Sequence, residues 1–136
     1  MTKPPRGTYV IVNRVLSPTD ERLAITFNGP EQPLTVNTRT DFSNQRWIVQ
    51  DYDQNTKSLV PVDATALQVA WGADCATVLP AHNYVWTIRE TDSGYTIQDG
   101  GVTVFWGVAN AVNNATVTIG TGTGDEKQRW FFERVL

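Results

Sequence analysis

Gln45-Arg46-Trp47, Tyr84-Val85-Trp86 and Gln128-Arg129-Trp130 are three short stretches that each place a tryptophan inside an apolar run. The three tryptophans follow one another at intervals of about 40 residues, which is the spacing of an internal repeat. A large apolar side chain that recurs at the same place in each repeat is suited to fill a shared core. We therefore expect the chain to fold as three similar units around one centre.

Two further apolar runs precede each tryptophan and show the period of a β-strand. Leu23–Gly29 aligns with Leu67–Ala73 and with Val102–Val108, and apolar residues alternate along each of them. A unit of about four short strands cannot bury its apolar face alone, so the three units must close on one another. The pattern predicts an all-β fold, a β-trefoil with threefold pseudo-symmetry, about twelve strands and a barrel capped by hairpins. A propeller would need at least four blades.

The composition is that of one folded domain. The chain has 136 residues, 40% of them hydrophobic, and no long Gly/Ser or Pro linker. We expect a single domain, 1–136, with repeats at about 7–50, 51–90 and 91–136. The net charge of −3 gives no basic field, so nucleic acid and anionic membranes are poor candidate partners. One cysteine, Cys75, and one histidine, His82, cannot form a structural zinc site, so no metal and no cofactor is expected.

The ends and the hydropathy indicate where the protein resides. Residues 1–7 lead directly into a strand pattern, without the apolar stretch and cleavage site of a signal peptide. No window approaches 18 consecutive apolar residues, so membrane insertion is not expected. These features predict a cytoplasmic protein.

Gln-x-Trp in the first and third repeats resembles the signature of the ricin-B-type β-trefoil lectins, a family in which this tryptophan is mostly core. The middle repeat departs from the signature because Tyr84 replaces the glutamine. Sugars are bound by aromatic faces under the ring and by a few fixed polar groups at its rim. Tyr52, Trp71, Tyr84 and Trp86, with Asn83, make such a set, although clustered aromatic residues are more often core than ligand-binding.

A closer resemblance covers nearly the whole chain from Gly7 onward. Tyr9–Pro18, Ala70–Ala73, Asn83–Thr87 and Gly94–Gly100 are similar to the small cytoplasmic lectins of the inky-cap type, fungal β-trefoil proteins that recognise fucosylated chitobiose. The resemblance implies a non-enzymatic lectin for the fucosylated N-glycan core, GlcNAc-GlcNAc with α1,3-linked fucose, that is toxic to nematodes and insects.

The resemblance further implies a single sugar site in the second repeat. The matching positions are Tyr52, Trp71, Gly72, Leu79, Asn83, Tyr84, Val85 and Trp86. We expect Trp71 and Tyr84 to stack on fucose and N-acetylglucosamine, and Leu79 and Val85 to receive methyl and acetyl groups. Asn83 and the Gly72 backbone would supply hydrogen bonds. The Trp86 ring is expected to be buried on one side and to line the site on the other.

Alternatives remain open at this stage. Fungal β-trefoil proteins also resemble cytosolic protease inhibitors, which act through protruding loops, and a structural protein with a vestigial site is a third reading. The partners expected are glycans, with the protein a monomer or weak homodimer.

Gly120–Gly124 lacks the Gly-Lys-Ser/Thr ending of a phosphate loop, and Asp51-Tyr52-Asp53 lacks the remaining ligands of an EF-hand. His82 is expected to be an exposed loop residue, and Cys75, beside Asp74, an inert thiol.

Overall fold

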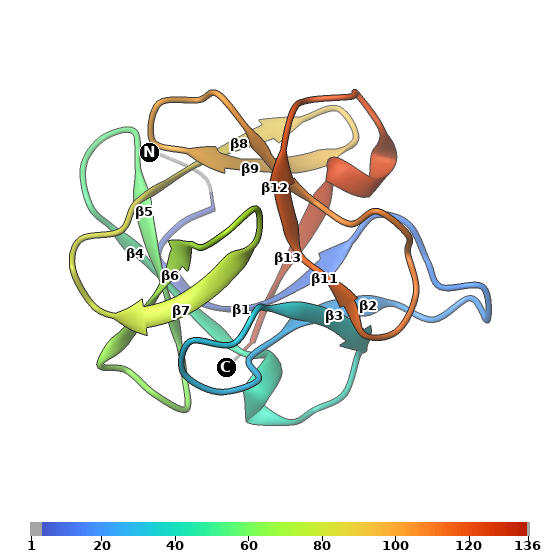
Figure 1. Ribbon diagram of the computed structural model, residues 1–136, viewed down its shortest axis with the longest axis horizontal. Helices are drawn as coiled ribbons and strands as arrows, with labels where there is room; N and C mark the ends of the chain where they lie inside the picture. The colour runs from blue at the N-terminus through green and yellow to red at the C-terminus, as the bar shows by residue number, and fades with distance from the viewer. Residues whose placement is uncertain (1–3, 136) are drawn as a thin grey trace.

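Six strands form a closed barrel in the computed structural model, which describes residues 4–135 (Figure 1). Each of the six is hydrogen-bonded in antiparallel fashion to two others, in the order β1-β4-β5-β8-β9-β13 and back to β1. The barrel strands are β1 (Gly7–Asn13), β4 (Trp47–Asp51), β5 (Lys57–Pro61), β8 (Trp86–Thr91), β9 (Gly94–Asp99) and β13 (Trp130–Arg134). The first and last strands are thus neighbours, and no barrel edge is left open.

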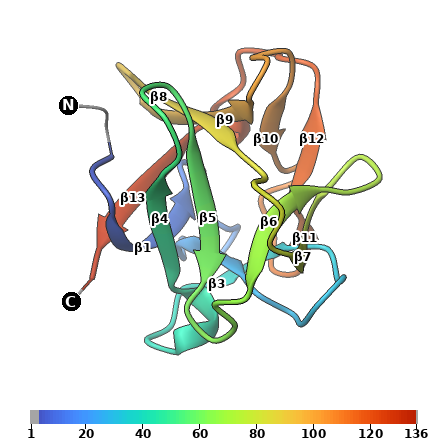
Figure 2. The ribbon, with the colours of Figure 1, turned by 90° about the vertical axis from the view of Figure 1, so that its left-hand side faces the viewer.

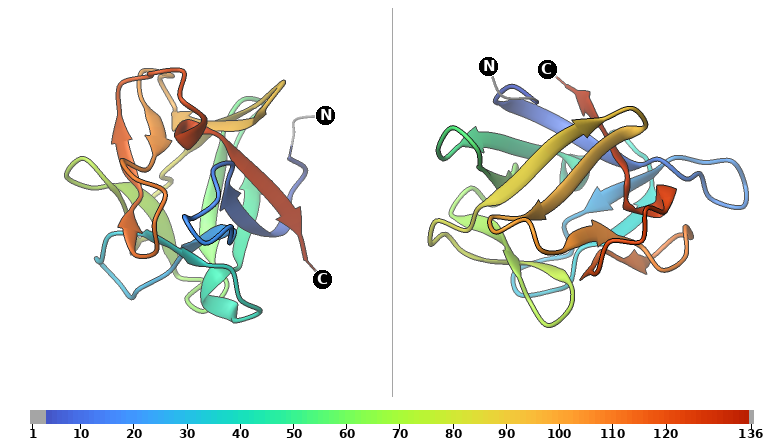
Figure 3. Two further views of the ribbon diagram at one scale, coloured as in Figure 1. Left: turned by 90° about the vertical axis from the view of Figure 1, so that its right-hand side faces the viewer. Right: turned by 90° about the horizontal axis from the view of Figure 1, so that it is seen from above.

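Three hairpins close one end of the barrel. They are formed by β2 (Leu23–Thr26) with β3 (Thr35–Thr38), by β6 (Leu67–Trp71) with β7 (Ala76–Pro80), and by β10 (Phe105–Gly107) with β12 (Thr118–Gly120). In Figure 2 the second and third hairpins lie on the side away from β1 and β13, and Figure 3 shows the same arrangement from two further sides. This is the predicted β-trefoil.

The recurring tryptophan makes the same hydrogen bond in all three repeats. The indole Nε1 donates to a backbone carbonyl of the hairpin strand: Trp47 to Ile25 at 3.0 Å, Trp86 to Val69 at 3.0 Å, and Trp130 to Trp106 at 3.1 Å. All three rings are at most 2% exposed. A buried indole N–H needs a partner, and here the partner joins each hairpin to its barrel strand. The sequence-based prediction that Trp47 and Trp130 are core residues is confirmed.

The three hairpins are also joined to one another around the pseudo-threefold axis. Leu34 N donates to Ala76 O at 2.8 Å, Ala76 N to Val117 O at 3.0 Å, and Val117 N to Leu34 O at 2.9 Å. These three residues are fully buried. Buried backbone groups must be paired, and this ring of three bonds pairs both groups of each residue.

The ring explains why the third repeat has one strand more than the pattern predicts. Thr116–Ile119 was expected as one run, but β11 (Ala115–Thr116) and β12 are separate because the amide of Val117 enters the ring instead of a ladder. The described residues therefore form thirteen strands, against about twelve expected.

The alignment of the third repeat needs a correction. The indole bonds make Trp106, and not Val104, the counterpart of Ile25 and Val69. The error is two residues, which leaves every side chain on its original face, so strand alternation gives no warning of it. The counterparts of Trp71 are consequently Phe27 and Val108.

Among residues 4–135 no helix is long and apolar enough to cross a membrane.

Candidate functional site

The connection that leads into the closing tryptophan has the same design in the first and third repeats. A 3-10 helix, η1 (Ser43–Gln45) or η2 (Glu126–Gln128), ends on the glutamine of Gln-x-Trp. The Oε1 atom of Gln45 accepts from Thr40 N at 2.8 Å, and that of Gln128 accepts from Thr123 N at 2.9 Å. The Nε2 atom of Gln45 donates to Thr38 O at the end of β3, and that of Gln128 donates to Thr121 O just after β12. The glutamine therefore stabilises its own connection.

The second repeat lacks this design. Residues 81–85 join β7 to β8 without a helix, and Tyr84 occupies the position of the glutamine. A residue of the hairpin holds this connection through a different pair of bonds: Gln68 Oε1, on β6, accepts from His82 N at 3.2 Å and from Tyr84 N at 3.0 Å. The side chain of residue 84 is thereby relieved of a structural role.

Gln68 was not among the residues predicted from the sequence to belong to the site. The sequence did contain a sign of its role, because the alignment of the repeats gives Gln68 the position that Ala24 has in the first repeat. A polar residue within an apolar run needs a partner when it is partly buried.

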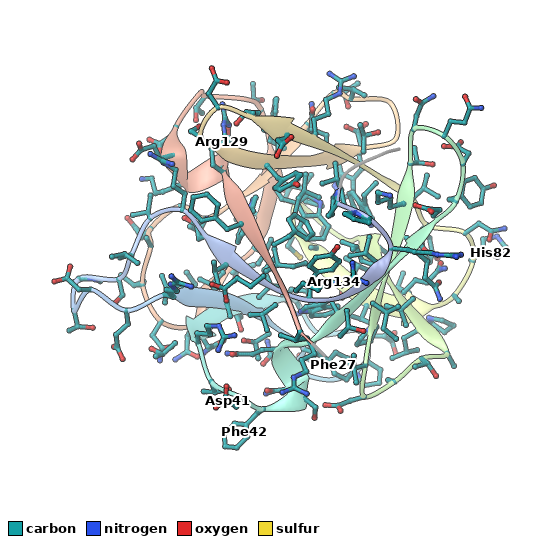
Figure 4. All side chains as sticks on the ribbon, turned by 180° about the vertical axis from the view of Figure 1, so that it is seen from behind. Phe27, Asp41, Phe42, His82, Arg129 and Arg134 are labelled. Carbon is teal, nitrogen blue, oxygen red and sulfur yellow. The ribbon has the colours of Figure 1, made fainter. Side chains whose placement is uncertain are left out.

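Asn83 stands at the turn of this connection. Its φ of +59° is in the left-handed region, which asparagine tolerates better than most residues, and its side chain is exposed. The rings of its two neighbours in sequence, His82 and Tyr84, lie near each other, with centroids 6.2 Å apart and planes tilted by 59°. His82 is exposed, as expected, and points outward at the periphery of the molecule in Figure 4.

The β6–β7 hairpin carries two further predicted residues, on different faces. Trp71 pairs with Ala76, and its side chain is on the same face of the hairpin as that of Val69, which faces the core. Leu79 pairs with Gln68, and both side chains are on the opposite face. Trp71 ends its row at the hairpin tip, where its ring is 47% exposed. A ligand that touches both Trp71 and Leu79 therefore has to reach across the edge of the hairpin.

The hairpin tip itself is held in place by the third repeat. Gly72 N donates to Cys75 O at 2.8 Å across the turn, and Ile119 N donates to Asp74 O at 3.0 Å. A side chain at Gly72 would meet Thr77 Cγ2 at 3.1 Å. The Trp71 ring thus projects from a fixed turn.

Tyr52 and Val85 occupy the flanks of the predicted site. Tyr52 is 53% exposed on the β4–β5 turn, which lies apart from the β6–β7 tip in Figures 1 and 2. Among the described residues no ring contact joins Tyr52 to Trp71 or Tyr84. Val85 lies beside Gly100, at the rim of a cavity of about 720 Å³ that Asn55 and other residues line. None of the eight predicted residues lines that cavity, and the structure does not gather all of them on one face.

The expectation for Trp86 was wrong in one respect. Its ring is 2% exposed and packs edge-on against Trp106, with the centroids 4.8 Å apart. The indole bond to Val69 fixes it in the core in the same way as its two counterparts. No face of the ring therefore lines a surface site.

Other candidate chemistries are not supported. In the part of the chain that is described, no group of three or more His, Cys, Asp or Glu side chains has the arrangement of a metal site. The amide of Asn55 and the hydroxyl and amide of Thr56 donate to Asp53, which lowers the pKa of that carboxyl and makes the segment a capped turn. Burial, and then the charge of Asp74, raises the pKa of the Cys75 thiol, as expected for an unreactive cysteine.

The barrel, the three hairpins and the tryptophan bonds define a β-trefoil protein whose second repeat carries exposed aromatic residues. Comparison with protein families identifies the chain more closely: residues 7–130 match the family described as CCL2 lectin-like, and the chain belongs to that family. Carbohydrate binding is the class of function that this family supports. No curated protein matches the sequence.

Solved structures with the same fold are distant in sequence. The designed threefold symmetric protein ThreeFoil is similar with a TM-score of 0.82 at 15% identity, over 95% of this chain and 99% of that one. The Macrolepiota procera ricin B-like lectin, solved with lactose, is similar with a TM-score of 0.76 at 14% identity, over 98% of this chain and 100% of that one. A mosquitocidal holotoxin is similar with a TM-score of 0.84 at 16% identity over 96% of this chain. The chain spans 17% of the holotoxin's length.

Proposed function

We propose that this protein is a lectin for the fucosylated core of N-glycans, GlcNAc-GlcNAc with an α1,3-linked fucose, and that it binds through its second repeat. One observation carries the assignment to this repeat. Gln68 accepts hydrogen bonds from the amides of His82 and Tyr84, so this connection is held without a glutamine at position 84, where a partly exposed tyrosine stands. The choice of glycan rests on the resemblance of Ala70–Ala73 and Asn83–Thr87 to lectins of that specificity.

The remaining repeats lack the same set of groups. The counterparts of Trp71 are Phe27, which is partly buried and packs edge-on against Trp47 at 6.4 Å, and Val108, which is 5% exposed. Tyr84 likewise corresponds to glutamines that are engaged within their own connections. We therefore expect one site per chain.

The proposed roles of the ligand-binding residues rest on the same resemblance and on the chemistry of their side chains. Trp71 and Tyr84 offer faces for the C–H surfaces of fucose and N-acetylglucosamine, and Leu79 and Val85 offer apolar contact for methyl and acetyl groups. Asn83 presents both a donor and acceptors at the turn. A shallow site of this kind gives a Kd of about a micromolar, or about −8 kcal/mol. A cytoplasmic defence role against nematodes and insects would then need weak dimers or dense glycans for avidity.

A glycan array that includes α1,3-fucosylated chitobiose tests the proposal. We expect the wild type to bind it, and both Trp71→Ala and Tyr84→Ala to weaken binding by about tenfold or more at unchanged melting temperature. Phe42→Ala is the matched control, because Phe42 is an exposed aromatic residue of the first repeat, 72% accessible, that points outward in Figure 4.

Two results would contradict the proposal. One is a wild-type protein that binds no glycan, above all if it inhibits papain or trypsin stoichiometrically. The other is equal binding by the wild type and by both variants, which would move the site away from the second repeat.

A further inference from the structure

We infer that Gln68 is a positioning residue of this carbohydrate site: its side-chain oxygen sets the path of residues 82–84 and thereby the orientation of Asn83 and Tyr84 toward the ligand. The inference rests on the proposed function for its ligand. Its structural part rests on two hydrogen bonds, 3.2 Å from His82 N and 3.0 Å from Tyr84 N, that end on the same oxygen atom.

Position 68 is specialised relative to its counterparts. Since Ile25, Val69 and Trp106 are equivalent, the residues before them are Ala24, Gln68 and Phe105. Neither alanine nor phenylalanine has a side-chain acceptor. The first and third repeats do not need one there, because Gln45 and Gln128 hold their connections from within. In the second repeat the side-chain acceptor that holds the connection therefore lies on the hairpin and not within the connection.

Residues 81–84 are attached to the start of β6 at three points. Ala81 N donates to Ala66 O at 3.0 Å, and the amides of His82 and Tyr84 both donate to Gln68 Oε1. Asn83 lies between the last two amides, in the left-handed conformation that turns the chain. Without the Gln68 oxygen only the first attachment remains. Residues 82–84 then sample other paths, and ligand binding has to restore one of them at an entropic cost.

Two substitutions separate the acceptor from the bulk of the side chain. Gln68→Glu keeps an oxygen in the same place, whereas Gln68→Met keeps the length but removes the acceptor. We expect Gln68→Met to weaken binding of fucosylated chitobiose, measured by titration calorimetry, by about tenfold. Gln68→Glu is expected to stay within about threefold of the wild type. Gln68→Ala replaces the methionine variant if the latter does not fold.

Amide hydrogen exchange of His82 and Tyr84 supplies a readout that does not depend on any sugar. We expect both amides to be protected in the wild type and in Gln68→Glu, and to exchange fast in Gln68→Met. Wild-type affinity in Gln68→Met, or unchanged protection of its two amides, overturns the inference. Equal loss of affinity in the glutamate and methionine variants also overturns it, because the acceptor would then not matter.

The two proposals fail in different ways. If the wild type binds no glycan but the amides lose protection only in Gln68→Met, the proposed function is refuted and the role of Gln68 in holding residues 82–84 stands.

Discussion

Replacing Trp86 by phenylalanine tests whether this ring is a core residue or a ligand-binding one. The indole N–H that is lost is the partner of the Val69 carbonyl at 3.0 Å, and a buried carbonyl without a partner costs about 1–3 kcal/mol. The smaller ring also loses contacts with Trp106 and leaves space, which costs roughly 1 kcal/mol more. We expect Trp86→Phe to lower the free energy of unfolding by about 2–4 kcal/mol. For a chain of this size that lowers the melting temperature by roughly 10 °C.

Urea unfolding followed by far-ultraviolet circular dichroism measures this change without relying on tryptophan fluorescence. Trp47→Phe is the matched control, because Trp47 makes the same bond to Ile25 at 3.0 Å and is 1% exposed. The two variants should lose stability to within about 1 kcal/mol of each other, while the exposed Trp71→Phe should change it by less than about 0.5 kcal/mol. A loss confined to Trp47→Phe, with Trp86→Phe as stable as the wild type, would refute the assignment of Trp86 to the core.

Three further predictions concern the turns around Gly94, Asp53 and Asn83. Gly94→Ala should destabilise the protein by about 1–3 kcal/mol in urea unfolding, because φ is +115° and the new methyl group would stand 2.9 Å from Trp130 O; Gly120→Ala, with open space around it, should be nearly neutral. The melting temperatures of Asp53→Asn and the wild type should approach each other as the pH falls below 3.8, the ordinary pKa of an aspartate. The lowered pKa of Asp53 means that its charged form stabilises the fold above that pH, and this stabilisation is lost when Asp53 is protonated. A series of melting temperatures against pH measures the effect. Asn83→Gly and Asn83→Ala should both weaken glycan binding in titration calorimetry, but only the alanine variant should also lose about 1 kcal/mol of stability, because glycine tolerates a φ of +59°.

The sequence was sufficient to predict the fold because the three tryptophans combine spacing, size and position. Trp47 and Trp130 are buried where the repeat places them. What alternation could not determine was the register of the third repeat, since a shift of two residues conserves the faces of a strand. The indole bond to Trp106 was needed to correct it.

The candidate site was predicted less completely. The exposure of Trp71 followed from its place at a turn, and the buried state of Trp86 followed from the repeat but not from the resemblance. Gln68 was missed because its partners are backbone amides of a segment fourteen and sixteen residues further along the chain. A side chain that bonds to distant backbone leaves no motif, and the opposite faces of Trp71 and Leu79 emerge only from the ladder register.

The ring formed by the backbones of Leu34, Ala76 and Val117 has a consequence for the assembly of the molecule. Each third donates to one neighbour and accepts from the other, so no third can satisfy its own groups and no pair can complete the circuit. Removing any one third would leave one amide and one carbonyl of the ring without their partners, so the three hairpins depend on one another for this part of the core.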